Sequence, residues 1–213
     1  MGSAMVGRLI LTLVLLFPLW CQAQASARSA PGDPVAPWAK VPAVVVVGAR
    51  TDDARLPLVR DAVAFWNRSF AELGSAFRLW PVTQVGGPAQ SPLESIQGIA
   101  GDLIVALSDG DFVSFAMRWP SLGKTLVAIK SDRFWPLSLP NVARNVIAHE
   151  IGHAIGLRHN SDAAALMCGR PAPCRPDAFA SETAHYFPLT AEEKLLLLRL
   201  YPADWRGSAG SSD

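Results

Sequence analysis

Three of the four histidines in the chain lie close together, at positions 149, 153 and 159. Residues four apart share one face of a helix, so His149 and His153 can direct their imidazoles at a single cation. Gly156 lets the backbone leave the helix in a conformation that is costly for other residues, and the turn brings His159 back as a third ligand. Three nitrogen ligands with one open position describe a catalytic zinc site, whereas structural zinc usually has four protein ligands.

Glu150 adds an acid–base group to this cluster. It follows His149 on the helix and is angled away from it, so it reaches a metal-bound water more easily than the metal, as a general base would. One alternative is a closed structural zinc site with His185 or Cys168 as fourth ligand. Another is a set of core histidines satisfied by hydrogen bonds. Burying Glu150 without a partner would be costly, which favours the catalytic interpretation.

The run HEIGHAIGLRH, residues 149–159, resembles the HExxHxxGxxH signature of the metzincin metalloproteases. Ala165, Leu166 and Met167 are similar to the Met-turn of that clan, and their spacing from His159 is most like that of the matrixins. The final helix, expected to open at Leu189–Glu193, also resembles theirs. The likeness implies an α+β, zincin-like fold: a twisted five-stranded mixed sheet with one antiparallel edge strand, an active-site helix and a C-terminal helix.

The resemblance also implies roles for individual residues. One zinc ion would be held by the three histidines, with Glu150 as general base and Met167 as the floor of the site. The segment Phe112–Trp119 would be the antiparallel edge strand, which pairs with an extended peptide substrate. Phe115, Ala116 and Tyr186 are possible residues of the substrate wall. Tyr186 is also a candidate donor to the oxyanion, although a surface or packing role is the favoured explanation for it.

The sequence gives little indication of metal sites other than the one at the three histidines. Matrixins commonly carry a second, structural zinc held by upstream histidines, but no histidine precedes His149 here. The resemblance therefore implies a single zinc ion. Asp109 and Asp111 are candidate calcium ligands, although a solvated turn is the favoured explanation for these two acids.

Residues 1–25 have the pattern of a secretory signal peptide. Arg8 precedes the apolar run Leu9–Trp20, and Ala23-Gln24-Ala25 follows as a cleavage site. A membrane anchor is the alternative, but the run is short for a bilayer and Pro18 interrupts it. We therefore expect export, either to a periplasm or to the extracellular medium, and no stable membrane span after cleavage.

Removal of residues 1–25 leaves two cysteines, Cys168 and Cys174. In an exported protein they most simply form one disulfide, with two free thiols as the alternative. Cys168 directly follows the expected Met-turn. The resemblance implies that the bridge shapes the wall of the pocket that receives the first side chain after the scissile bond.

The expected organisation is an extended, proline-rich leader over 26–40, one catalytic domain over 41–206 and a flexible tail over 207–213. The domain is divided into an N-terminal part, 41–158, and a C-terminal part, 159–206. Apolar runs and turn signals predict strands over 43–48, 77–82, 102–108, 112–118 and 125–131, with a loop over 86–98. Helices are predicted over 56–73, 140–156 and 190–200, the last with a capping box from Thr190 and Glu193.

Composition limits the possible functions of the 213-residue chain. It is 50% hydrophobic, with 19 basic and 18 acidic residues. The apolar fraction is ample for a core, and the net charge of +1 gives no case for nucleic acid or an anionic membrane as partner. We expect a monomeric zinc endopeptidase acting on peptides or proteins. The alternatives are a non-catalytic, zinc-containing extracellular binding module and a zinc hydrolase of non-peptide amides.

Overall fold

The structure is a computed structural model that describes residues 36–48, 50, 52–85, 95–169, 174 and 183–207. The expected signal peptide, most of the expected leader and the last six residues of the tail lie outside this range. In the described part of the chain, no helix has the length and apolar character needed to cross a membrane.

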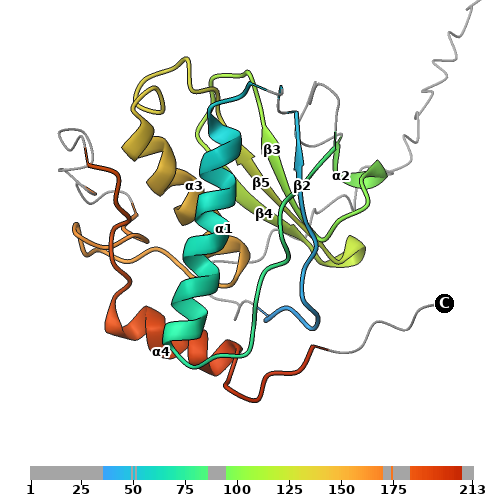
Figure 1. Cartoon of the computed structure of the whole chain (residues 1–213), viewed down its shortest axis with the longest axis vertical. Helices are drawn as coiled ribbons and strands as arrows, with labels where there is room; N and C mark the ends of the chain where they lie inside the picture. Colours follow the sequence, from blue (N-terminus) through green and yellow to red (C-terminus); the bar gives the residue numbers. More distant parts are fainter. Residues whose placement is uncertain are drawn as a thin grey trace, which may run out of the picture. The chain divides into compact units, whose positions relative to one another are not determined.

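Five strands form one mixed sheet in the order β2-β1-β3-β5-β4 (Figure 1). Neighbouring strands are parallel except at one edge, where β4 runs antiparallel to β5. This confirms the expected fold class and the antiparallel edge strand. The strands are β1 (Val44–Val47), β2 (Thr83–Gln84), β3 (Leu103–Leu107), β4 (Phe115–Trp119) and β5 (Lys124–Ile129).

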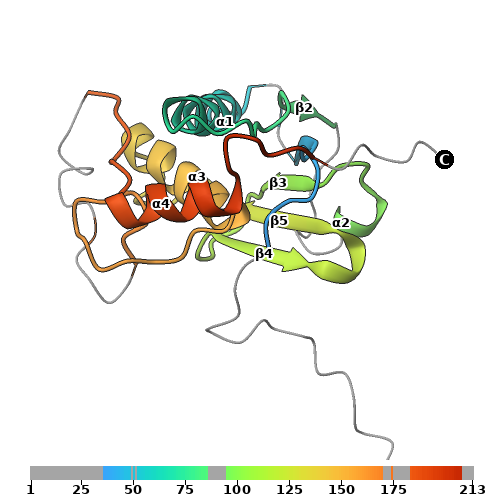
Figure 2. The ribbon, with the colours of Figure 1, turned by 90° about the horizontal axis from the view of Figure 1, so that it is seen from below.

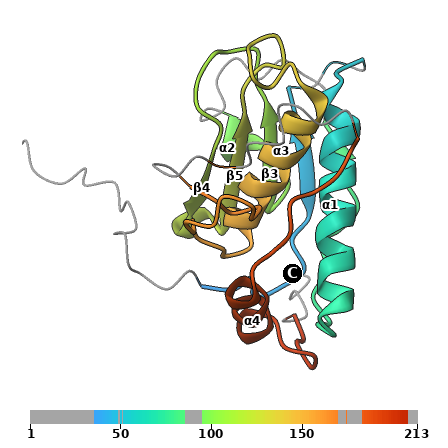
Figure 3. The same ribbon diagram turned by 90° about the vertical axis from the view of Figure 1, so that its left-hand side faces the viewer.

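Two long helices, α1 and α3, lie side by side against one face of the sheet, as Figures 1 and 3 show. Helix α4 lies beyond the sheet, at the end of the molecule where α1 finishes (Figures 1 and 2). The helices are α1 (Arg55–Glu72), the short α2 (Ser95–Gly98), α3 (Pro140–Ala154) and α4 (Ala191–Leu200), with a 3-10 turn η1 over Pro120–Leu122.

The central strands are buried on both faces. In β1, Val44 and Val46 pack with α1 and α3 in the main core, while Val45 and Val47 face a second cluster that includes Ile96 of α2. Because neither face of these strands contacts solvent, their sequences are continuous apolar runs. This is why they could be predicted from the sequence.

The expected strand over 77–82 is wrong. The segment has no strand partner there and is held in part by a side chain, because Leu79 N–H donates to Asn67 Oδ1 at 2.7 Å and Leu79 O accepts from Asn67 Nδ2 at 3.0 Å. Pro81 has no N–H to give to a ladder. Pairing with β1 begins only at Thr83.

Several boundaries also differ from the expected ones. The predicted strand over 112–118 begins only at Phe115, and the predicted loop over 86–98 contains α2. Residues 36–40, expected in the leader, belong to the compact unit, because Trp38 is buried and its Nε1 donates to Ala154 O at 3.0 Å.

Candidate metal centre

Helix α3 carries the first two histidines, and the chain after it supplies the third. The Nε2 atoms of His149 and His153 lie 3.1 Å apart, and that of His159 lies 3.1 Å and 3.0 Å from them. Gly156 makes this possible, because its φ of 109° turns the backbone sharply after the helix. The three rings meet at one point.

The other ring nitrogens show that the cluster fits a cation. Nδ1 of His149 lies 2.9 Å from Leu166 O, and Nδ1 of His153 lies 2.9 Å from Leu157 O. A carbonyl only accepts, so we assign the proton to Nδ1, which leaves an Nε2 lone pair on each of these rings. Burial lowers the pKa of His153 to about 4, which keeps the ring neutral.

Lone pairs at this separation repel unless a cation lies between them. Zinc–nitrogen bonds of about 2.0–2.1 Å in tetrahedral geometry place ligand nitrogens about 3.3 Å apart, close to the spacing here. In the described part of the chain, this triad is the only group of three His, Cys, Asp or Glu side chains placed to share an ion. The residues therefore fit one zinc ion.

Asn160 supports the third ligand and was missed by the sequence analysis. Its N–H donates to Met167 O and its carbonyl accepts from Gly169 N–H, both at 3.0 Å. Its Nδ2 donates to Glu193 Oε1 at 2.6 Å. The residue after His159 is thus tied both to the expected Met-turn and to α4. No sequence pattern links Asn160 with Glu193.

Gly169 packs directly against the ring of the third ligand. A Cβ added at Gly169 would lie within 2.6 Å of both Cβ and Nδ1 of His159, closer than real side chains approach. Met167 is fully buried in the main core, and the preceding residue, Leu166, supplies the carbonyl that holds His149. The turn after His159 therefore positions two of the three ligands.

A pocket of about 610 Å³ opens at the triad. Glu150 lines it and is only 7% exposed. Cys168 and Cys174 form the expected disulfide, and both contribute to the wall. Phe115 and Ala116 of β4 lie in the lining as expected, together with residues of α3 and of the loops that precede β4 and α3.

Comparison with protein families agrees with this geometry. The matrixin family matches residues 122–180, which contain all three histidines and Met167. The match supports a zinc metallopeptidase of the metzincin clan. Among solved structures, the chain is similar to archaemetzincin from Methanopyrus kandleri, with 18% identity over 76% of this chain and 96% of that chain and a TM-score of 0.45. No curated protein sequence matches the chain.

Tyr186, a possible wall residue, is not among the described residues that line the pocket, and it has the packing role that was the favoured alternative. Its ring stacks on Phe65 of α1 at 4.2 Å and lies under the Arg144 guanidinium, 5.4 Å from its centroid. The surrounding side chains partly bury it, and this burial raises the pKa of its phenol. Tyr186 therefore packs between α1 and α3 instead of facing the pocket.

The two candidate fourth ligands of the alternative, structural zinc site are used elsewhere. Cys168 is in the disulfide, and His185 lies beside Asn141 of α3. The neighbouring Asn145 lines the pocket one turn before His149. Its Nδ2 donates to His185 O and its Oδ1 accepts from Phe187 N–H, both at 3.0 Å. Asn145 thus fastens the segment that holds His185 and Phe187 to helix α3.

Asp109 and Asp111, the candidate calcium ligands, lie in the loop before β4. The Asp111 carboxylate is paired with Lys130 Nζ at 2.8 Å. Among the described residues, no third acidic side chain joins these two acids in a metal-sized cluster. The structure thus shows an ion pair with Lys130 at one of these two acids.

Proposed function

We propose that the protein is an exported, zinc-dependent endopeptidase of the matrixin type, with Glu150 as its general base. The observation that carries this proposal is the convergence of three histidine Nε2 atoms within 3.1 Å of one another, in a pocket that Glu150 also lines. Three ligands leave a coordination position open for water and substrate.

The residues divide the chemistry between them. A bound zinc would act as a Lewis acid that polarises the scissile carbonyl and makes water more acidic. The carbonyls of Leu166 and Leu157 hold His149 and His153 in one orientation and one tautomer. Glu150 takes a proton from the attacking water and passes it to the leaving amine nitrogen.

A peptide is the substrate class that best suits the surroundings of the triad. Strand β4 lies at the edge of the sheet and pairs only with β5 among the described strands. An extended peptide can add to such an edge through main-chain hydrogen bonds, with its side chains in neighbouring pockets. Phe115 and Ala116 join this edge to the pocket, so a bound peptide would lead its backbone toward the histidines.

Export is supported by the signal-like pattern of residues 1–25 and by the disulfide between Cys168 and Cys174, a bond typical of oxidising compartments. Amino-terminal sequencing of the protein recovered outside the cytoplasm tests it. We expect the recovered chain to begin at Ser26, and a chain that stays in the cytoplasm with residues 1–25 attached would contradict export.

The central experiment compares the native protein with Glu150→Ala. Metal analysis should give one zinc per chain for both, because Glu150 is not a ligand. Cleavage of a mixed peptide library should be abolished by a chelator, and Glu150→Ala should lower it by a factor on the order of 10³. Glu72→Ala, at the exposed end of α1, is the control and should cleave normally.

Other outcomes would point to other functions. Undiminished cleavage by Glu150→Ala would overturn the role of Glu150. A zinc-loaded native protein that cleaves no peptide would indicate a binding module, or a hydrolase of other amides if it cleaves those. Products formed only by removal of terminal residues would contradict an endopeptidase.

A further inference from the structure

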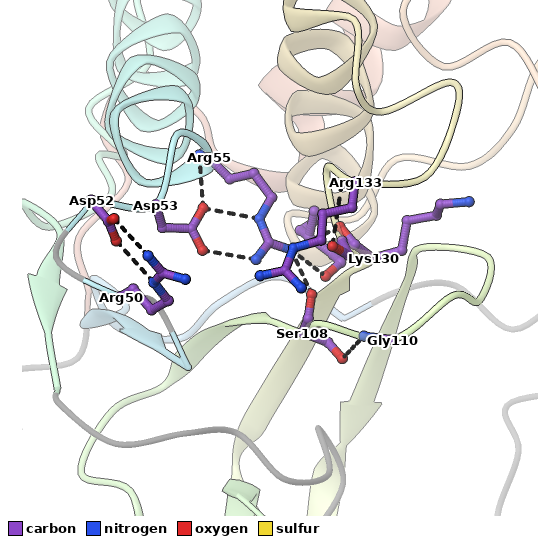
Figure 4. Close-up of polar contacts among 10 residues, drawn as sticks. Arg50, Asp52, Asp53, Arg55, Ser108, Gly110, Lys130 and Arg133 are labelled. Atoms are coloured by element: carbon purple, nitrogen blue, oxygen red, sulfur yellow. Dashed lines mark hydrogen bonds and ion pairs between the residues drawn. The ribbon is translucent and has the colours of Figure 1, made fainter.

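Two arginine–aspartate pairs lie near the start of α1, and Figure 4 shows them together. Each guanidinium faces a nearby carboxylate through two nitrogens: Arg50 with Asp52, and Arg55 with Asp53. The first pair is exposed, with side chains 65% and 66% accessible. The second is buried, at 2% and 8%. Only in the Arg55–Asp53 pair is the guanidinium buried, and a buried charged group needs a hydrogen-bond partner for each of its donors.

Arg55 reaches two strands as well as its aspartate. Its Nη1 donates to Ser108 O at 2.7 Å, to Lys130 O at 2.8 Å and to Ile129 O at 3.3 Å. These carbonyls lie at the carboxyl ends of β3 and β5. The guanidinium therefore joins the start of α1 to the points where two loops leave the sheet.

These loops, which we call the rim loops, are residues 108–114 and 130–139, and both line the pocket. Contacts between them continue from the guanidinium outward. Ser131 N–H donates to Gly110 O at 3.1 Å, and Lys130 N–H donates to Ser114 Oγ at 3.1 Å. Lys130 Nζ then pairs with Asp111. The network of hydrogen bonds thus runs from the buried Arg55 guanidinium to residues that line the pocket, such as Ser114 and Lys130.

The rim loops also carry exposed apolar side chains. Val113 is 73% exposed and lines the pocket, while Trp135 is 69% exposed in the other loop. Lys130 Nζ lies 3.4 Å from Trp135 O, so the same lysine contacts both loops. Apolar side chains beside a pocket suit the apolar residues of an extended ligand.

We propose that Arg55 is a positioning residue for substrate binding. It fixes the two rim loops relative to each other, so that Val113 and Trp135 can contact apolar side chains of a peptide held along β4. The proposal rests on the proposed peptidase function. Arginine suits this position because its planar fork serves a carboxylate and several carbonyls at once, which a lysine ammonium cannot do from one point.

The test compares Arg55→Lys and Arg55→Met with Arg50→Met, the same change in the exposed pair. In zinc-loaded protein, both Arg55 variants should raise KM for a long apolar peptide, Arg55→Met by about tenfold, and leave kcat nearly unchanged, because they alter binding and not the reacting groups. Arg55→Lys should be the milder variant. Arg50→Met should match the native protein in both constants.

Amide hydrogen exchange supplies a readout without turnover, measured well below the unfolding transition. The Gly110 and Ser131 amides should exchange faster in the Arg55 variants, while the amides of α3 keep their native protection. Native KM in both Arg55 variants would overturn the proposal. So would faster exchange spread evenly over the molecule, which would indicate a purely stabilising role.

The two proposals fail in different ways. If the native protein cleaves no peptide, the proposed function fails. Amide exchange in the rim loops would still show whether Arg55 fixes the two loops relative to each other. If Arg55→Met does not fold, Arg55→Lys carries the comparison. Native exchange at Gly110 and Ser131 in that variant would overturn the positioning role.

Discussion

At the scale of single residues, the site depends on groups that contact the back of each histidine. His149 and His153 are held through Nδ1 by main-chain carbonyls. His159 is the most exposed of the three, and its ring rests against the backbone at Gly169. Solvent around an exposed ring does not fix its orientation, so the contact with Gly169 matters for His159. The orientation of the ring sets the direction of the nitrogen lone pair that would bind the metal.

Gly169→Ala should therefore weaken zinc binding. The new methyl would overlap the base of the His159 ring, which cannot swing away without moving Nε2. We expect zinc affinity to fall by about 10–100-fold, the range for loss of a contact that orients a ligand. Competition with a chromogenic chelator measures it. Gly98→Ala is the control, because a methyl there meets nothing within 4 Å. Equal zinc affinity in both variants would contradict the orienting role of Gly169.

At the scale of secondary structure, α4 supports the site through its amino-terminal cap. The expected capping box is confirmed, because Thr190 Oγ1 accepts from Glu193 N–H and Glu193 Oε2 accepts from Thr190 N–H. The other carboxylate oxygen of Glu193 accepts from Asn160 Nδ2. One buried side chain thus starts the helix and holds the turn that carries His159.

Glu193→Ala should affect both stability and metal binding. Loss of the cap and of the Asn160 contact should lower the free energy of unfolding by about 1–2 kcal/mol, measured in urea. Zinc affinity should fall as well, because the turn is released. Glu192→Ala is a matched control, since Glu192 is the exposed neighbour in the same turn of the helix. If the two variants behave alike, the buried carboxylate does not connect α4 to the site.

The same elements show what the sequence could predict. Strands β1 and β3 were predictable because burial on both faces leaves a continuous apolar run, and α4 because its cap lies within four residues. The strand over 77–82 failed because Asn67, from another element, supplies hydrogen bonds that a neighbouring strand was expected to supply. A side-chain contact of this kind has no local pattern.

The site divides in the same way. His149, Glu150 and His153 were predictable because helical spacing alone brings them together. The signature adds Gly156 and His159 at fixed offsets. Asn160, Gly169 and Arg55 were missed, since each acts on a partner that only the folded chain brings near. For Tyr186 the sequence left a wall role and a packing role open, because its position does not reveal that its ring stacks on Phe65.

At the scale of the whole molecule, Tyr201 joins three distant parts of the chain. Its hydroxyl donates to Ile155 O at 3.0 Å, where the backbone leaves α3, and accepts from Trp38 N–H at 3.2 Å. Its ring stacks on Phe77 at 4.0 Å. The amino-terminal segment, the end of the active-site helix and the carboxyl end of α4 are thus tied through one phenol.

Burial raises the pKa of Tyr201 to about 12, although the Trp38 N–H opposes this shift. The unfolded chain releases the same proton near pH 10, so the folded state binds more protons between these values. Stability from this group is therefore complete below pH 10 and is lost as pH rises toward 12, by about 3 kcal/mol in total.

Tyr201→Phe removes this titration together with the hydroxyl's two hydrogen bonds. Below pH 10 the native protein should be the more stable in urea, and its advantage should shrink steadily as pH rises from 10 toward 12. Tyr186→Phe, measured in parallel, shows how much of the pH dependence comes from the other tyrosine, whose phenol pKa burial also raises. A native advantage that stays constant across this pH range would show that the Tyr201 phenol ionises equally in both states, and that it is not the buried link described here.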